Sequence, residues 1–357
     1  MAKQLIKSDF NGQTIYVGID VGKKSWFVSI YTTWFEHKTI TQPPSALPLV
    51  AYLRQTFPNA RYLCAYEAGY SGFWPYHDLT ALGVECLVVH PTDVPTKDKE
   101  RRNRNDRVDA RKLARGLRNG ELEGIYVPDR AAQEDRGLVR ARDMLVKKQT
   151  RCKNQIRAQL SYYGITPPPE INTSSWSGRF IGWLETTSFA TASGRKTLDV
   201  LLQELRFLRQ QIADLTRQIR ALANEERYQC QVRLLRTIPG ISTLSAMILL
   251  TELVDPARFG DLDHLASYVG LIPGSDSSGT KQVDTGLTNR RNCALRHLLI
   301  ECSWMAVRKD PALMLRFDEL SERMPKSKAI VCIAHKLLNR IRFVLKNQQP
   351  YVMAVIE

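Results

Sequence analysis

Two carboxylates stand three residues apart in residues 105–114, which read NDRVDARKLA. On a helix, positions i and i+3 lie on one face with Cβ atoms about 5–6 Å apart, so Asp106 and Asp109 would be neighbours. At that separation and an effective dielectric constant near 20, two bare carboxylates repel by roughly 3 kcal/mol. The pair therefore favours a bound cation, although an acidic first turn that complements the helix dipole is the plain structural explanation.

The acidic pair is surrounded by positive charge. The lysines and arginines around it are Lys97, Lys99, Arg101, Arg102, Arg104, Arg107, Arg111, Lys112, Arg115 and Arg118. A divalent metal in a basic surface suits phosphodiester chemistry, because the metal polarises a phosphate that the basic side chains attract. Since the sequence has neither a CxxC pair nor an HExxH motif, a metal ion would be bound through oxygen ligands, which favours Mg²⁺ or Mn²⁺.

The chain as a whole is strongly basic, with a net charge of +15 over 357 residues. Such an excess favours a polyanionic partner, with nucleic acid ahead of an anionic membrane. No apolar run approaches the roughly 20 residues that span a bilayer, and residues 1–13 lack the apolar core of a secretory signal. The seven cysteines are scattered, which is typical of buried thiols in a reducing compartment. We therefore expect a cytoplasmic protein without a membrane partner.

The elements that must position the acids alternate between strand and helix patterns. Short β-rich runs cover residues 15–20, 26–31, 37–41, 61–66 and 84–89, and helical apolar spacing covers residues 46–57 and 73–82. Asp20 ends the first strand, and Glu67 follows the fourth. This order of elements matches a ribonuclease-H-like domain, which we place at residues 14–132. The four acids that would converge there are Asp20, Glu67, Asp106 and Asp109.

The middle of the chain is predicted to be a coiled-coil region over residues 133–232. Apolar residues from Leu198 to Leu222 recur with alternating spacings of three and four, which is typical of a coiled coil. Their partner would be the charged helical segment 133–163, another subunit, or both. Residues 167–196 interrupt the region as an irregular insertion that begins with three prolines, which do not fit a helix interior.

The last region, residues 233–345, is predicted to be mostly helical. Its tetrapeptide IPGI, residues 238–241, resembles a helix-hairpin-helix turn, whose amides commonly face a phosphate, but a simple corner between two helices explains it equally well. A small polar loop is expected over residues 273–281, where the serines are most simply turn formers. Arg290 and Arg291 precede a further helix, and a helix N-terminus flanked by arginines suits a phosphate.

Taken together, these segments resemble the DEDD-type insertion-sequence transposases, also described as bridge-RNA-guided recombinases, and the related Piv-type DNA invertases. The matching segments, in chain order, are YVGIDVGKKSW, CAYEAGYSGFW, NDRVDARKLA, LLRTIPGISTLSAMIL, LASYVGLIPGSDSSGT and NRRNCALRHLLI. The resemblance covers about residues 15–345. It implies an α/β plus α architecture, with a RuvC-like N-terminal domain, a coiled-coil middle and a mostly helical C-terminal transposase domain.

The resemblance also implies roles for single residues. Asp20, Glu67, Asp106 and Asp109 fall on the family's acidic, metal-binding tetrad. Ser278 falls on its nucleophilic serine, although the Thr-Lys that follows Gly279 departs from the commoner Ser-Gly-Ser-Ser form and leaves Ser277, and then Ser275, as alternatives. The expected nucleic-acid contacts are Arg102, Arg104, Arg107, Arg111, Lys281, Arg290 and Arg291.

The implied function is the cutting and rejoining of target and donor DNA at an insertion sequence, guided by a structured noncoding RNA. A homodimer that assembles into a tetramer would bring the serine of one subunit to the tetrad of another. Two alternatives stay open. A RuvC-like structure-specific endonuclease would hydrolyse DNA junctions with metal-activated water and form no covalent intermediate. A non-catalytic nucleic-acid-binding scaffold would carry the same acids as ordinary surface charge.

Overall fold

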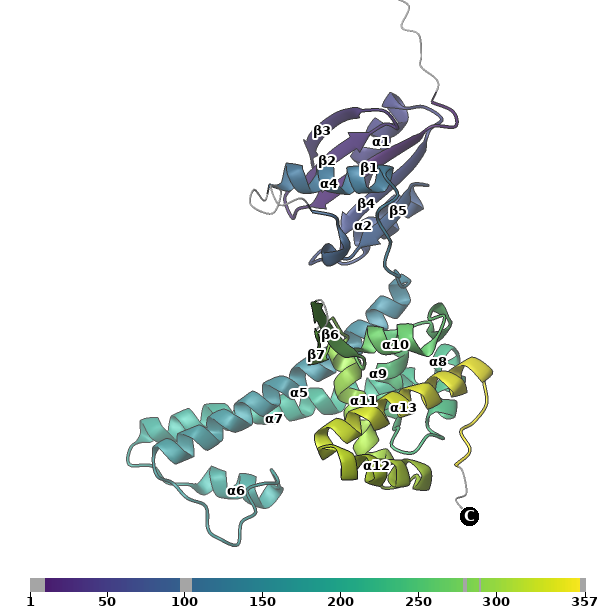
Figure 1. Ribbon diagram of the computed structural model, residues 1–357. Helices are drawn as coiled ribbons and strands as arrows, with labels where there is room; N and C mark the ends of the chain where they lie inside the picture. Colours follow the sequence, from purple (N-terminus) through teal and green to yellow (C-terminus); the bar gives the residue numbers. More distant parts are fainter. Residues whose placement is uncertain (1–9, 97–104, 279–280, 289, 354–357) are drawn as a thin grey trace, which may run out of the picture. The chain divides into compact units, whose positions relative to one another are not determined.

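The computed structural model describes residues 10–96, 105–278, 281–288 and 290–353, with only the backbone for those between 275 and 285 (Figure 1). The chain divides into two compact units, residues 1–127 and residues 128–357. The first contains the expected α/β domain, and the second contains the helical remainder. Their boundary lies five residues before the one expected from the sequence, because the long helix α5 already begins at Arg130.

The first unit is built on one five-stranded sheet. Its strands are β1 (Thr14–Val21), β2 (Trp26–Tyr31), β3 (Glu36–Gln42), β4 (Arg61–Glu67) and β5 (Glu85–Val89), in the spatial order β3-β2-β1-β4-β5. The three strands β1, β2 and β3 pair antiparallel, whereas β1, β4 and β5 run parallel. The strands lie where the sequence pattern predicts them, and their mixed pairing agrees with the nuclease-like domain expected.

Helices cover both faces of this sheet. They are α1 (Ala46–Thr56), α2 (Trp74–Ala81) and α4 (Asp106–Arg118). Helix α4 crosses one face over β1 and β2, and α1 lies behind the sheet in the view of Figure 1. Strand β1 is consequently covered on both sides, as expected of a central strand. Ile15, Val17 and Ile19, which share one face of the sheet, have no exposed surface, and Gly18 on the other face is buried under α4.

A helical arm forms the first part of the second unit. Helix α5 (Arg130–Tyr162) and helix α7 (Ala192–Leu222) lie side by side along most of their length (Figure 1). Buried residues of α7, among them Leu198, Leu205 and Leu208, pack with residues of α5. The apolar stripe of α7 thus finds a partner within its own chain. Supercoiling of the pair and contact with another subunit remain predictions.

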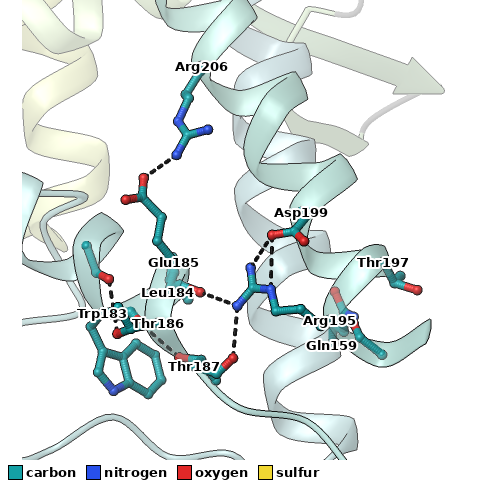
Figure 2. Close-up of polar contacts among 12 residues, drawn as sticks. Gln159, Trp183, Leu184, Glu185, Thr186, Thr187, Arg195, Thr197, Asp199 and Arg206 are labelled. Carbon is teal, nitrogen blue, oxygen red and sulfur yellow. Dashed lines mark hydrogen bonds and ion pairs between the residues drawn. The ribbon is translucent and has the colours of Figure 1, made fainter. Parts of the chain in front are cut away.

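The irregular insertion expected in the arm contains a short helix, α6 (Gly178–Thr186). Its end is held by the guanidinium of Arg195, which donates to the carbonyl oxygens of Leu184 at 2.7 Å and Thr187 at 2.9 Å and to the carboxylate of Asp199 at 2.6 Å (Figure 2). A second ion pair, between Arg206 and Glu185, joins α7 to α6. These contacts give the insertion a defined place against α7.

The rest of the second unit is a helical bundle with one hairpin. Its helices are α8 (Glu226–Leu235), α9 (Thr243–Leu253), α10 (Leu262–Val269), α11 (Cys293–Ala306), α12 (Pro311–Arg323) and α13 (Lys326–Asn347). The hairpin consists of β6 (Pro273–Ser278) and β7 (Lys281–Leu287). Helix α13 runs through the core, where Ile333, Leu337 and Ile341 are fully buried. No helix in the described part of the chain is long and apolar enough to cross a bilayer.

The IPGI segment forms the corner between α8 and α9. Gly240 has φ +90°, and a Cβ at this position would lie 2.5 Å from the Cys302 carbonyl oxygen of α11, so the corner requires a glycine for both conformation and space. The amide of Ile241 donates to the Ile238 carbonyl oxygen at 3.1 Å. The corner therefore has an evident packing role against α11, and its contact with a phosphate stays a prediction.

Candidate active site

The parallel pairing of β1 and β4 brings the first two acids to the same edge of the sheet. The last paired residues are Ile19 and Tyr66, so Asp20 and Glu67 occupy the next position on each strand. Parallel strands have their carboxyl ends at one edge, which is where side chains from both can meet. Asp20 is partly buried at this edge.

The other two acids arrive on the first turn of α4, which packs directly on β1. A Cβ at Gly18 would lie only 2.1 Å from the carbonyl oxygen of Ala110 and 2.4 Å from the amide nitrogen of Ala114. The backbones of strand and helix can approach this closely only because Gly18 has no side chain. Helix α4 begins at Asp106, with the Asn105 side chain accepting from the Arg107 amide as its N-cap.

Gly18→Ala should therefore separate α4 from β1. The added methyl group would meet backbone atoms that cannot rotate away, and overpacking of this kind costs about 1–3 kcal/mol. We expect a lower melting temperature in thermal unfolding followed by circular dichroism. Gly137→Ala in α5 is the matched control, because nothing lies within 4 Å of a Cβ there and alanine favours a helix by about 0.5–1 kcal/mol. Equal melting temperatures for the two variants would contradict the close approach at Gly18.

The four acids form one electrostatic cluster. The pKa of Asp20 is raised to about 6, first by burial and then by the charges of Asp106, Asp109 and Glu67, while Lys112 lowers it. Neighbouring carboxylates raise one another's pKa because each disfavours the ionised form of the next. Residues from two strands and one helix are thus close enough to act on the same carboxyl group.

Lys112 belongs to this cluster, although the sequence pattern indicated only one more surface cation. Its Nζ lies 2.7 Å from Oδ1 of Asp109, and its side chain is only 9% exposed. A buried lysine with an acidic partner neutralises part of the charge around Asp20. The sequence feature that could have indicated this role is the position of Lys112, three residues after Asp109 and next to Leu113, which is also buried.

The cluster has the right donor type for a hard divalent cation, because every acid in it offers carboxylate oxygens. As the side chains are placed, however, the described residues contain no group of three or more Asp, Glu, His or Cys that could hold a metal ion. An ion would thus require these carboxylates to turn toward a common point. Its positive charge would replace the repulsion around Asp20 with attraction.

The expected nucleic-acid contacts near the cluster have different surroundings. Arg107 is exposed on the first turn of α4. Arg111 instead pairs with Glu36 of β3 at 2.8 Å and donates to Thr39 at 3.2 Å, so it helps to hold α4 against the sheet while remaining half exposed. Arg102 and Arg104 lie outside the described residues.

The candidate nucleophile lies in the second unit, in a hairpin rather than the polar loop expected. Ser278 is the last residue of β6 and pairs with Lys281, the first residue of β7. The alternatives Ser277 and Ser275 pair with Gln282 and Asp284. The small polar residues indicated a loop, but pairing with residues 281–287 satisfies their backbone groups as a strand. Ser278 thus stands where the hairpin turns.

Buried polar contacts fix the base of this hairpin. Arg296 of α11 donates to the carbonyl oxygens of Gly270 at 2.9 Å and Thr288 at 3.2 Å, on either side of the hairpin. Glu252, which is 1% exposed, accepts both hydrogen bonds of the Arg140 guanidinium and one from Asn292. These contacts join α5, α9 and the start of α11 below the two strands.

The arginines expected at the start of α11 are exposed, but the helix end itself is already capped. The Asn292 side chain accepts from the amides of Ala294 and Leu295, each at 3.1 Å. Capping of this kind satisfies the amides that a phosphate would otherwise meet. A phosphate at this place would therefore be bound by the side chains of Arg290 and Arg291 and not by the amides of the helix end.

Comparison with known proteins gives two family matches. Residues 17–165 match the transposase family model DEDD_Tnp_IS110, and residues 232–318 match the family described as transposase IS116/IS110/IS902. The matched residues contain the acidic cluster and the hairpin, and the two models leave residues 166–231 uncovered, which include the insertion and α7.

Individual relatives agree with these matches. The putative transposase y4qE of Sinorhizobium fredii is 35% identical over 68% of this chain, which spans 58% of that protein's length. The transposase for insertion sequence element IS1111A of Coxiella burnetii is 29% identical over 79% of this chain and 77% of its own. The transposase for IS1328 of Yersinia enterocolitica is 25% identical over 93% and 96%.

Proposed function

Because this chain belongs to the IS110 family of insertion-sequence transposases, we propose that it cuts and rejoins DNA through a metal-assisted serine nucleophile. The observation that carries the proposal is the convergence of four acids on one edge of the first unit's sheet, seen in the strand register and in the raised pKa of Asp20. Ser278, at the turn of the hairpin, is the proposed nucleophile.

The acids Asp20, Glu67, Asp106 and Asp109 would hold Mg²⁺ or Mn²⁺, in keeping with the DEDD type of the matched domain. When bound, such an ion polarises the scissile phosphate and stabilises charge on the leaving oxygen. Lys112 keeps Asp109 oriented through its 2.7 Å contact and offsets part of the cluster's charge. The basic side chains Arg107, Arg290 and Arg291, all exposed, would hold the DNA backbone.

The proposed covalent step conserves the energy of the phosphodiester bond. The Ser278 oxygen forms a bond to phosphorus, the bond from phosphorus to the sugar oxygen breaks, and the serine's proton is finally carried by that sugar oxygen. A sugar hydroxyl of the partner strand then attacks the phosphoserine, which rejoins the DNA and restores the serine. Because each step exchanges one phosphoester for another, no ATP is needed. A hydroxyl is a weak nucleophile near neutral pH, so the step depends on activation within the site.

The proposal includes a partner for sequence choice and an assembly. A structured noncoding RNA would pair with target and donor DNA, while the protein contacts backbone and shape, the division found in other RNA-guided systems. The net charge of +15 supports binding to such polyanions. A homodimer that assembles into a tetramer would supply a serine from one subunit and acids from another, which would delay cutting until both DNAs are present.

The proposal predicts a metal-dependent covalent adduct. The purified chain, with the RNA encoded beside its gene, is incubated with DNA that spans the element's junction and is then separated on a denaturing gel. With Mg²⁺ we expect a protein–DNA band that resists denaturation and disappears on proteolysis, and with EDTA we expect none.

Two other results of the same gel would contradict the proposal. Metal-dependent cleavage without an adduct would identify a hydrolytic endonuclease, since activated water leaves nothing attached to the protein. Tight binding with no cleavage in Mg²⁺ or Mn²⁺ would leave a nucleic-acid-binding scaffold. Omission of the RNA alone tests guidance, because an adduct of unchanged yield and position would exclude a role for it.

A further inference from the structure

Three cations in the helical arm converge on one tryptophan. Lys153 and Arg157 are one helical turn apart on α5, and their charged groups lie 5.8 Å and 5.4 Å from the centre of the Trp176 ring. Arg209 of α7 donates to the Trp176 carbonyl oxygen at 2.6 Å. Trp176 itself precedes α6 in the insertion, so the cluster combines three segments that are distant in sequence.

The tryptophan is held firmly but remains partly exposed. Its ring meets that of Phe180, which is fully buried, with centroids 5.1 Å apart in an edge-to-face arrangement. Arg157 also donates to the carbonyl oxygen of Thr173 at 3.1 Å, which ties the preceding loop to α5. A rigid, partly exposed indole beside cations is a common platform for a nucleic-acid base or sugar.

No acid is paired with the cations of this cluster in the part of the chain that the structure describes. None of its three cations forms an ion pair there, and Lys153 makes no hydrogen bond either, so its ammonium group has the face of the Trp176 ring as its described partner. Two carboxylates of the arm are already paired with other arginines, Asp199 with Arg195 and Glu185 with Arg206 (Figure 2). Residues 145–209 contain ten lysines and arginines but four acids.

The electrostatics of the cluster are unfavourable without a counter-ion. The pKa of Lys153 is lowered, first by burial and then by the charges of Arg209 and Arg157. Like charges that are close together and partly buried repel one another, and a bound anion would remove that repulsion and stabilise the cluster. Arg157 and Arg209 each have further N–H donors besides those that hold the loop, and these are suited to phosphate oxygens.

We propose that Lys153, Arg157, Arg209 and Trp176 form a binding site for the phosphodiester backbone of a nucleic acid. The three cations would contact phosphates, and the exposed part of the indole would lie against a sugar or base. The site lies where the loop before α6 meets α5 and α7, and Figure 1 shows α6 beside this arm. It would anchor nucleic acid on the arm, outside the hairpin that carries Ser278, and it does not depend on the chemistry proposed for that serine.

The test compares the full-length chain with the double variant Lys153→Gln/Arg157→Gln. Binding to a single-stranded RNA and to a duplex DNA, each of about 30 nucleotides per strand, is measured between about 50 and 200 mM salt. Two lost phosphate contacts should weaken binding about tenfold and reduce the slope of log K against log salt by about 1.4 for the single strand or about 1.8 for the duplex. Lys147→Gln/Arg217→Gln is the matched control, because these two arm cations already pair with Asp143 and Asp214.

A weaker affinity and a smaller salt dependence of binding, with either probe, support the site. The probe that is affected shows whether the site binds RNA, DNA or both. Unchanged values with both probes, or an equal loss in the control, would overturn it. If the double variant does not fold, a second measurement uses the wild-type chain. The fluorescence of Trp176 is obtained as the difference between wild type and Trp176→Phe, and we expect the bound probe to quench it. An unquenched difference would also overturn the site. The binding measurement involves no cleavage, so failure of this site and failure of the catalytic proposal are distinguishable.

Discussion

Ser278→Ala is expected to abolish both the covalent protein–DNA adduct and recombination, with nucleic-acid binding unchanged. The substitution removes the only oxygen that the side chain offers to phosphorus, so the exchange of phosphoesters cannot begin. Removal of a nucleophile from an enzyme of this kind lowers the rate by roughly 10³-fold or more. The adduct is measured on a denaturing gel, and binding by a mobility shift with the same DNA and RNA.

The neighbouring serines of the hairpin are the internal controls. Ser277→Ala and Ser275→Ala change residues that pair with Gln282 and Asp284 in the same two strands, so they report any general effect of altering this hairpin. We expect both to retain the adduct. An adduct that persists in Ser278→Ala but is lost in Ser277→Ala would move the nucleophile one residue along β6.

Asp20→Asn is expected to stop DNA cleavage and, in EDTA, to stabilise the fold. Loss of cleavage follows from removal of a central carboxylate of the cluster, and Asp106→Asn should be inactive for the same reason. Stabilisation follows from the pKa of Asp20, which is about 6 in the folded protein against an ordinary 3.8. Because the folded state disfavours the ionised form, ionisation of Asp20 lowers stability as the pH rises through about 6.

The size and pH dependence of this effect can be measured. After allowance for the partial exposure of Asp20, the gain is on the order of 1 kcal/mol above pH 6 and disappears below about pH 4, where the carboxyl is protonated in both states. Thermal unfolding in EDTA at several pH values gives the difference. Added Mg²⁺ should raise the melting temperature of wild type more than that of Asp20→Asn, since a bound ligand stabilises the folded state.

Glu85→Gln is the matched control for Asp20→Asn. Glu85 lies on β5 of the same sheet and pairs with the exposed Arg61, which lowers its pKa instead of raising it. Its loss should reduce stability slightly, in the opposite direction, and leave cleavage intact. If Asp20→Asn still cleaved DNA at the wild-type rate, the acids would not form the catalytic cluster proposed here.

The family and most of the first unit could be read from the sequence by itself. Strands β1 and β2 and helices α1 and α2 lie within a residue or two of the ranges predicted for them. The reason is physical: apolar periodicity and a cap such as Asn105 are local properties, and they specify an element without reference to the rest of the chain. The order of these elements was enough to predict that four acids converge.

Other contacts between distant residues were decided only by the tertiary structure. The sequence indicates that Lys112 is a surface cation, whereas in the structure the packing of α4 on β1 buries it beside Asp109. The serine loop became a hairpin because residues 281–287 supply its missing hydrogen bonds. The cluster around Trp176 joins α5, the insertion and α7. Pairings of this kind depend on contacts between segments far apart in the chain, and neither the composition nor the periodicity of any one segment encodes them.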